Sequence, residues 1–445
     1  MTSAPRSQKT AKETDEQRLQ KSVEVQLQSY ARFGVDLGLD RIESLLSVLG
    51  NPQQQIPIIH VAGTNGKGSV CAYLSAVLSA AGYRTGRYTS PHLINWTERI
   101  CINGEPISWQ SLQTGLDAVE QAIETNQTPD APIPTQFEVF TAAAWQYFAQ
   151  QEVDIAVVEV GLGGRLDATN VCSQPLATVI VSISRDHWQR LGSTLAEIAG
   201  EKAGILKPGA PAIAGPLPPE AAAVVTAKAA ELNAPLTWIT PAKKVAASTE
   251  PTLTYNGIQY PQVLLGEHQQ VNSACAIAVL QTLRDQGWNI SDNAIARGMA
   301  QVSWPGRLQK SKWQGHPLLI DGAHNVDAAR SLRAYLDRTY PSEPITWLMG
   351  MLATKDHEGV FGALLRAGDR LHLVPVPGHL SAELGELSAI AQQQCLSLDE
   401  VQTHPDLTTA LTAATAQNKA LAIAASPTVF CGSLYLIGSF FEQMC

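Results

Sequence analysis

Ile58-Ile59-His60-Val61-Ala62 is followed directly by Gly63-Thr64-Asn65-Gly66-Lys67-Gly68-Ser69. The first five residues are typical of a buried strand, and the apolar residues after Ser69 predict a helix. Glycines allow a tight turn whose N–H groups point at phosphate oxygens, and the helix N-terminus adds partial positive charge. Lys67 can reach the terminal phosphates, and Ser69 is placed to approach an associated Mg²⁺. This strand, turn and helix predict an α/β fold with a nucleotide phosphate site.

This glycine turn departs from the ordinary Walker A pattern at two positions. Val61 stands where the first glycine is usual, and Gly68 separates Lys67 from the hydroxyl residue. A glycine-rich turn without any ligand is the alternative interpretation. A lysine inside a turn with three glycines is hard to explain structurally, so we favour phosphate binding.

Short β-branched runs alternate with longer amphipathic stretches along the chain. We predict strands at Ile56–Ala62, Asp154–Val160, Thr178–Ser182, Pro317–Ile320, Ile345–Leu348 and Thr428–Phe430. We predict helices at Gly68–Ala81, Gln136–Gln151, Thr194–Ala203, Gln270–Gln286 and Val326–Thr339. This alternation is typical of α/β proteins with mostly parallel sheets covered by helices.

At 445 residues the chain is too long for one ordinary core, so two domains are expected. Asn256-Gly257 lies between two alternating runs within residues 252–265 and predicts a β-hairpin at the end of the first domain. Trp304-Pro305-Gly306 interrupts the chain before a fresh β/α alternation. We therefore predict a disordered tail over 1–20, a large P-loop-type domain with helices on both sheet faces over 21–305, and a smaller Rossmann-like α/β domain over 306–445.

The composition is that of an ordinary globular protein, with 45% hydrophobic and 16% charged residues. The net charge is −9 without a dense basic block, which argues against a nucleic-acid partner but not against a small anionic substrate. Seven scattered cysteines without a CxxC spacing predict reduced thiols rather than disulfides or zinc. The sequence has neither an apolar signal segment at its start nor a run of about 18 apolar residues. We expect a cytoplasmic monomer without a membrane segment.

The variant turn GTNGKGS resembles the Mur-type amide ligase superfamily, in particular the folylpolyglutamate synthase/dihydrofolate synthase family. Other similar segments also fall in the family's order, namely DLGL at 36–39, SPHL at 90–93, EVGLGGRLDATN at 159–170, DH at 186–187, EKAGI at 201–205, HQ at 268–269 with Asn272, PGR at 305–307, DGAHN at 321–325 and GSLY at 432–435. The resemblance runs from about residue 25 to the C-terminus. So many matches in one order make it specific.

The position and charge of Glu159 indicate a metal site, independently of the resemblance. It ends a predicted buried strand, where a carboxylate needs a cation or hydrogen bonds, and Mg²⁺ prefers such oxygen ligands. A salt bridge to lysine or arginine is the alternative. The resemblance implies that Glu159, Ser90 and His187 are metal ligands. It also implies a carbamate on Lys202, which composition alone would make an ordinary exposed helix lysine.

The resemblance also implies the substrate residues. For ATP these are Asn272, Arg307 and Asp321 beside the glycine turn. For the pterin they are Asp36, Leu37, Gly38, Leu39, Thr135, Gln136, Phe137, Glu138, Leu166, Asp167 and Ala168. His324 is implied as a catalytic residue and Ser433 as a substrate residue. The alternatives are helix capping by Thr135 and Glu138, turn capping by Asp167, a core role for Phe137, and loop or helix capping by His324 and Ser433.

The resemblance implies an ATP-dependent ligase with ATP and Mg²⁺ as cofactors. ATP would phosphorylate the carboxylate of a pteroate or folate, and the amino group of L-glutamate would attack the acyl phosphate. LDATN at 166–170 favours acceptance of dihydropteroate as well as tetrahydrofolate, hence a bifunctional enzyme. The alternatives are a monofunctional enzyme, a peptidoglycan Mur ligase and a non-enzymatic nucleotide switch. Only 62 residues precede Gly63, which disfavours the peptidoglycan ligase.

Overall fold

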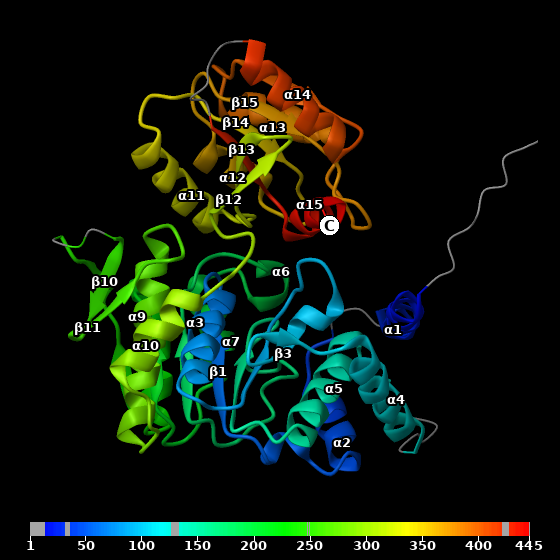
Figure 1. The fold of residues 1–445 in the computed structure, drawn as a ribbon, viewed down its shortest axis with the longest axis vertical. Helices are drawn as coiled ribbons and strands as arrows, with labels where there is room; N and C mark the ends of the chain where they lie inside the picture. Colours follow the sequence, from blue (N-terminus) through cyan, green and yellow to red (C-terminus); the bar gives the residue numbers. More distant parts are fainter. Residues whose placement is uncertain are drawn as a thin grey trace, which may run out of the picture.

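Two α/β domains follow one another along the chain in a computed structural model (Figure 1). The structure describes residues 14–31, 36–125, 133–246, 248, 250–420 and 427–444. The blue to green part of the chain forms the larger domain, and the yellow to red part forms the smaller one (Figure 1). The predicted fold class is confirmed.

The larger domain is built on an eight-stranded sheet in the order β4-β3-β2-β5-β1-β6-β7-β8. The strands from β2 to β8 in this order are parallel, and β3 and β4 are antiparallel additions at one edge. Because β1 pairs with both β5 and β6, the glycine turn after β1 lies at the centre of the carboxyl edge. The strands are β1 (Ile58–Ala62), β2 (Thr85–Tyr88), β3 (Ile100–Ile102), β4 (Glu105–Pro106), β5 (Ile155–Glu159), β6 (Ala177–Ile180), β7 (Ala212–Ala214) and β8 (Leu236–Trp238).

Helices cover both faces of this sheet. Successive residues of each strand point to opposite sides, and both sides carry apolar residues that the helices bury. Ile59 and Val61 pack into one core with α3, α9 and α10, whereas Ile58 packs into another with α1, α2, α4 and α5. A third core packs α7 and α8 against β6 and β7. The helices are α1 (Asp15–Ala31), α2 (Asp40–Val48), α3 (Lys67–Ala80), α4 (Trp109–Thr125), α5 (Gln136–Gln150), α6 (Trp188–Leu191), α7 (Leu195–Ala203), α8 (Pro219–Glu231), α9 (His268–Asp285) and α10 (Asp292–Gln301), with the 3-10 helices η1 (Pro52–Gln54) and η2 (Trp96–Arg99).

The predicted hairpin is confirmed. Strands β10 (Thr252–Tyr255) and β11 (Ile258–Pro261) pair antiparallel, and β9 (Lys243–Lys244) adds a third strand. Asn256 and Gly257 form the turn with positive φ angles of 48° and 82°. An Asn-Gly pair tolerates this backbone, which is why it marks tight hairpins.

The smaller domain has a six-stranded sheet in the order β12-β13-β17-β14-β15-β16. Five strands are parallel, and β12 is an antiparallel edge strand. Its elements are β12 (Gln309–Trp313), β13 (His316–Ile320), α11 (Val326–Thr339), β14 (Thr346–Met349), α12 (His357–Leu364), β15 (Arg370–Leu373), α13 (Leu384–Gln394), β16 (Glu400–Thr403), α14 (Leu407–Ala420), β17 (Thr428–Cys431) and α15 (Leu434–Met444).

A buried carboxylate ties the smaller domain together. Asp369 is 1% exposed and accepts hydrogen bonds from the Ile345 and Arg366 N–H groups at 2.8 and 3.0 Å. Trp347 Nε1 donates to it at 2.9 Å, and the buried guanidinium of Arg333 donates at 3.0 Å. Such a carboxylate stabilises the fold only while its partners are present, since a buried charge without partners is costly.

The two domains approach each other closely at one helix of the smaller domain. Gly438 lies in α15, and a Cβ atom there would collide with the carbonyl oxygen of Leu93 in the larger domain. The connection between the domains runs through residues 302–308, between α10 and β12. The domains therefore meet backbone to backbone beside the connection that joins them.

The prediction of a disordered tail over residues 1–20 is wrong for residues 15–20, which lie in α1. Residues 1–13 lie outside the described residues. Val23 and Leu27 of α1 are fully buried in the core shared with α4 and α5, so tertiary packing accounts for the helix despite its polar composition. No helix in the described part of the chain is both long and apolar enough to cross a membrane.

Candidate active site

The glycine turn has the backbone expected of a phosphate-binding loop. Gly66 precedes α3 with a φ of 87°, a left-handed conformation that suits glycine. Lys67 curls back over the turn, donating to the carbonyl oxygens of Gly63 and Thr64 at 3.1 and 3.3 Å. Its ammonium also lies 3.9 Å from Glu159 Oε1. An ammonium held at the mouth of such a turn can contact an anion bound to the N–H groups.

The loop after β6 braces this turn. Ser182 Oγ accepts from the N–H of Asn65 and donates to its carbonyl oxygen, both at 2.9 Å. Thr64 Oγ1 in turn donates to the Ser184 carbonyl at 3.1 Å and accepts from its N–H at 3.0 Å. These four hydrogen bonds preorganise the turn before any ligand binds.

Gly68, the residue that breaks the Walker A pattern, lies against a tryptophan from the interdomain connection. A Cβ atom at Gly68 would lie only 2.6 Å from Cζ2 of Trp304. The guanidinium of Arg87 lies 5.0 Å from the centre of the Trp304 ring, a cation–π arrangement. The extra glycine is thus explained by packing: it admits the indole of Trp304 beside the first turn of α3.

Glu159 ends β5 with its carboxylate buried and weakly partnered. The side chain is 6% exposed, and its firmest hydrogen bond is from the N–H of Ser90 at 3.3 Å. Burial raises the pKa of Glu159, and the nearby charge of Lys67 offsets this only in part. A buried carboxylate with such long contacts fits a cation ligand. In the described part of the chain, three acidic, His or Cys side chains do not converge on one point, so waters or phosphates would supply the other ligands.

Lys202, at the end of α7, is 5% exposed, unlike an ordinary helix lysine. Its ammonium donates to the carbonyl oxygen of Gly63 at 2.9 Å. Burial, reinforced by the charge of Lys67, lowers the pKa of Lys202 to about 7. A substantial neutral fraction therefore exists near neutral pH. His187, in contrast, is half exposed, has a φ of 50°, and lies at the edge of the same site.

A cavity of about 320 Å³ joins these residues. It is lined by every residue predicted to hold ATP or metal and by the predicted catalytic residue His324. The ATP and metal residues are Gly63, Thr64, Asn65, Gly66, Lys67, Gly68, Ser69, Ser90, Glu159, His187, Lys202, Asn272, Arg307 and Asp321. Asp321 accepts from the N–H groups of Leu308 and Ala323, both at 2.9 Å. Burial lowers the pKa of Arg307, which nevertheless stays far above neutral as arginine does.

A second cavity of about 500 Å³ contains most of the residues predicted to hold the pterin. Its lining includes Asp36, Leu37, Gly38, Thr135, Gln136, Phe137, Glu138, Leu166, Asp167, Ala168 and Ser433. Leu39 is not part of the lining and packs instead against the neighbouring core. The hydroxyl of Ser433 is buried and has no hydrogen-bond partner among the described residues, so it is free to contact a ligand.

Five of these polar side chains already have structural partners, and two of them are Asp36, which accepts from Arg41, and Gln136, which donates to the Leu27 carbonyl. Thr135 and Glu138 form a capping box at the start of α5, and Glu138 also accepts from Arg41 at 3.1 Å. Asp167 accepts from the N–H groups of Leu162 and Thr169 at 2.8 and 3.0 Å, and from the Thr169 hydroxyl at 2.6 Å. These carboxylates therefore shape the pocket, whatever they also offer a ligand.

Phe137 combines packing with exposure to the second cavity. It is only partly buried, and a Cβ at Gly161 would lie 2.5 Å from its Cζ atom. The end of its ring therefore packs closely against the glycine-rich stretch after β5. Phe137 also lines the second cavity, where a planar heterocycle could stack on its ring.

The two cavities meet. Ser90, Pro91, Gly161, Leu162, His187, His324 and Leu434 line both of them. His324 comes from the smaller domain, and its Nδ1 lies 2.8 Å from the carbonyl oxygen of Gly322, which can only accept. That contact fixes a proton on Nδ1 and orients the ring over the junction.

Sequence reasoning missed three cationic side chains that line the second cavity, Arg99, Arg190 and Lys355. Arg99 stacks on Trp96 with 4.2 Å between guanidinium and ring centre, and its Nε donates to His92 at 2.8 Å. Lys355 reaches the cavity from the smaller domain. Lys355 follows β14 at the carboxyl edge of a parallel sheet, and this position in the sequence could have indicated that Lys355 belongs to the site.

Comparisons with known proteins define the class. Residues 61–280 match the model of the Mur ligase middle domain, and residues 306–443 match that of the dihydrofolate synthetase C-terminal domain. A central Mur-type domain with this phosphate loop defines an ATP-dependent ligase. The chain belongs to the folylpolyglutamate synthase/dihydrofolate synthase family.

Individual relatives agree over most of the chain. Folylpolyglutamate synthase of Lacticaseibacillus casei is 40% identical over 355 residues, 76% of this chain and 81% of the relative. Dihydrofolate synthase/folylpolyglutamate synthase of Bacillus subtilis is 36% identical over 354 residues, 77% of this chain and 81% of the relative. The structure of Mycobacterium tuberculosis folylpolyglutamate synthase complexed with ADP and AMPPCP superposes with a TM-score of 0.87 at 32% identity, covering 96% of this chain and 99% of that one.

Proposed function

We propose that this ligase uses ATP to join L-glutamate to dihydropteroate and to tetrahydrofolate, the second activity lengthening a polyglutamate chain. One observation carries the proposal: the phosphate-loop cavity opens into a second cavity with an aromatic wall. A γ-phosphate in the first would meet the carboxylate of an acid whose ring lies in the second. The bifunctional name of the Bacillus subtilis relative supports both activities.

The chain's own groups suit acyl-phosphate chemistry. Lys67 and Arg307 both line the first cavity and would neutralise charge on the phosphates as the terminal phosphoryl group moves to the carboxylate. The amino group of glutamate then attacks the acyl carbon, phosphate leaves, and the ammonium proton is released. His324 lines both cavities, and we propose that the glutamate amine enters beside it. Ser433 offers a buried hydroxyl nearby to a glutamate or folate oxygen.

Mg²⁺ fits the proposed site, with Glu159, Ser90, His187 and Ser69 as its surroundings and the nucleotide supplying further oxygens. When bound, it would neutralise the phosphates and orient them. We also propose that Lys202 carries a carbamate. Its buried, partly neutral amine is the form that reacts with CO₂, and the product would be a carboxylate-like group facing the same cavity.

Product analysis tests the proposal. Purified protein is incubated with ATP, Mg²⁺, L-glutamate and either dihydropteroate or tetrahydrofolate, and products are identified by mass spectrometry. We expect a single addition to dihydropteroate and repeated additions to tetrahydrofolate. Product from one substrate only would indicate a monofunctional enzyme. ADP release that does not depend on glutamate or on either pterin would contradict the proposal.

Three further properties stay predictions and need separate measurements. We propose that the enzyme is monomeric, which light scattering on the purified protein tests. We propose that its partners are small molecules rather than nucleic acids, in keeping with the net charge of −9. We also propose a cytoplasmic location, in keeping with cysteines that are free at all six described positions.

A further inference from the structure

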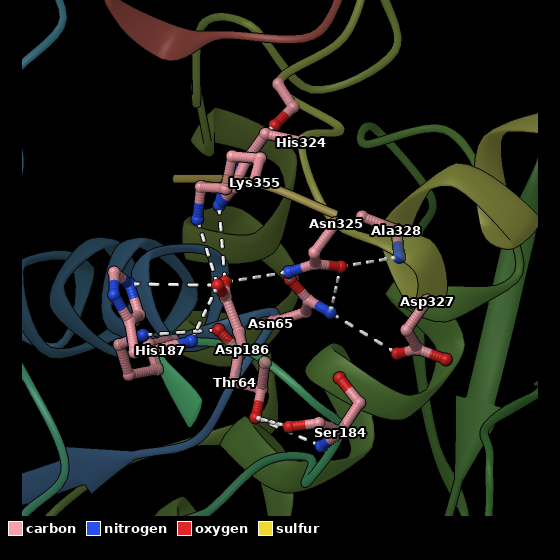
Figure 2. A network of polar contacts seen from close by, with 12 residues as sticks. Thr64, Asn65, Ser184, Asp186, His187, His324, Asn325, Asp327, Ala328 and Lys355 are labelled. Carbon is pink, nitrogen blue, oxygen red and sulfur yellow. Dashed lines mark hydrogen bonds and ion pairs between the residues drawn. The ribbon is translucent and has the colours of Figure 1, made fainter. Parts of the chain in front are cut away.

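A single carboxylate of the larger domain receives three side chains of the smaller domain (Figure 2). Asp186 accepts from Lys355 Nζ at 2.9 Å and from Asn325 Nδ2 at 3.1 Å, and lies 3.5 Å from His324 Nε2. We call these four residues the Asp186 cluster. Asp186 lies in the loop that braces the glycine turn, so the cluster connects that loop directly to the smaller domain.

The burial of the cluster gives these contacts weight. The side chains of Asp186 and Lys355 are only 11% and 12% exposed, so solvent screens their attraction weakly. Burial alone would raise the pKa of Asp186, but the hydrogen bond from His324 and the charge of Lys355 outweigh it and lower that pKa. If the domains separated, each group would lose its partner, which is more costly than for an exposed ion pair.

A second contact ties the phosphate loop itself to the smaller domain (Figure 2). Asn65 and Asn325 exchange amide hydrogen bonds of 3.0 and 3.2 Å, and Asn65 Nδ2 also lies 3.3 Å from Asp327 Oδ2. Asn325 is rigidly held, because its Oδ1 also accepts from the N–H of Ala328 as the N-cap of α11. Nucleotide loop and smaller domain therefore share one hydrogen-bond network.

We propose that Asp186 is a positioning residue that docks the smaller domain through Lys355 and Asn325, and so keeps water from the acyl phosphate. This inference rests on the proposed function. With the domains docked, the acyl phosphate is attacked by the glutamate amine. With the domains apart, water attacks the acyl carbon instead, which returns the free acid and phosphate and consumes ATP without product. The docking contacts thus set how much ATP is spent for each amide.

The test compares ADP formed with glutamyl conjugate formed, in wild type and in Lys355→Met. Methionine keeps the length of the side chain and removes its charge. Wild type should form about one ADP per conjugate. The variant should form at least about 5-fold more ADP per conjugate, because coupling between two sites typically changes a property by at least this factor. Small-angle X-ray scattering with AMPPCP should show a larger radius of gyration for the variant. Lys312→Met, an exposed lysine on β12, serves as the matched control and should behave as wild type.

A double-mutant cycle separates docking from effects on the neighbouring His187. Asp186→Asn and Lys355→Met remove the same ion pair, so the double variant should be little worse than either single one. Fully additive effects, or a Lys355→Met protein that is as compact and as tightly coupled as wild type, would overturn the proposal. If wild type makes no conjugate at all, the proposed function fails instead, and the scattering comparison still decides whether Lys355 docks the domain.

Discussion

Lys202→Met should make the protein more stable while abolishing ligase activity. The ammonium of Lys202 is buried beside Lys67, and burial lowers its pKa from 10.5 to about 7. Each pKa unit corresponds to about 1.4 kcal/mol, so the charged form costs the folded state about 5 kcal/mol. Methionine removes that cost. It also removes the hydrogen bond to the Gly63 carbonyl, worth about 1 kcal/mol, although that oxygen keeps its bond from Lys67.

The net gain in the free energy of unfolding should be about 3–4 kcal/mol at pH values below 7. Between pH 7 and 10.5 the unfolded state holds a proton that the folded state has released, so wild-type stability rises with pH across this window. The advantage of the variant is therefore full below pH 7 and falls as the pH rises, until near pH 10.5 only the loss of the hydrogen bond remains.

Denaturant unfolding in CO₂-free, metal-free buffer, at one pH below 7 and one close to 10, provides the measurement. Carbonate must be excluded because a carbamate would itself remove the positive charge. Lys228→Met on the surface of α8 is the control and should change stability by less than about 0.5 kcal/mol. A Lys202→Met protein that is less stable than wild type below pH 7, or whose stability difference from wild type does not depend on pH, would refute the argument.

Three other substitutions test the packing of the site and of the smaller domain. Gly68→Ala forces a methyl group against Trp304, so the KM for ATP should rise at least about 10-fold, and a Trp304→Ala background should restore part of the loss in steady-state assays. Asp369→Ala removes the buried carboxylate that accepts from Arg333 and Trp347, leaving the buried Arg333 only its partly exposed partner Asp337 and the Leu364 carbonyl, and should cost the smaller domain about 3–5 kcal/mol, seen as an early transition in calorimetry. Phe137→Ala removes a stacking face worth about 1 kcal/mol, so the KM for the pterin substrate should rise about 5-fold while that for ATP stays unchanged.

Local patterns predicted the fold well. The glycine turn after β1 and the Asn-Gly hairpin depend on backbone conformations that few residues adopt, so the residues themselves carry the signal. Thr135 and Glu138 likewise form the capping box that their spacing indicates. The helix at residues 15–31 was missed because its polar composition hides a narrow apolar face, which only the surrounding core makes stable.

The site could be predicted only where a local sequence motif indicated it. Asp186 and Lys355 are 169 positions apart, and nothing local in either segment indicates that they pair. The contact between Gly68 and Trp304 is similarly distant, so the extra glycine looked like a departure without a cause. The burial of Lys202 could not be predicted for the same reason. The sequence of its helix is that of a surface helix, and Lys202 is buried by its contact with the distant glycine turn. Charges and packing across the two domains arise from tertiary structure alone.

Because Gly438 lies so close to the carbonyl of Leu93, a larger residue at position 438 would push the two domains apart. A single methyl group there would hold the two domains slightly apart without substituting any residue that lines either cavity. Enlarging this side chain stepwise would give a graded series of partly opened enzymes. Such a series would make it possible to study how separation of the domains governs turnover without altering the chemistry itself.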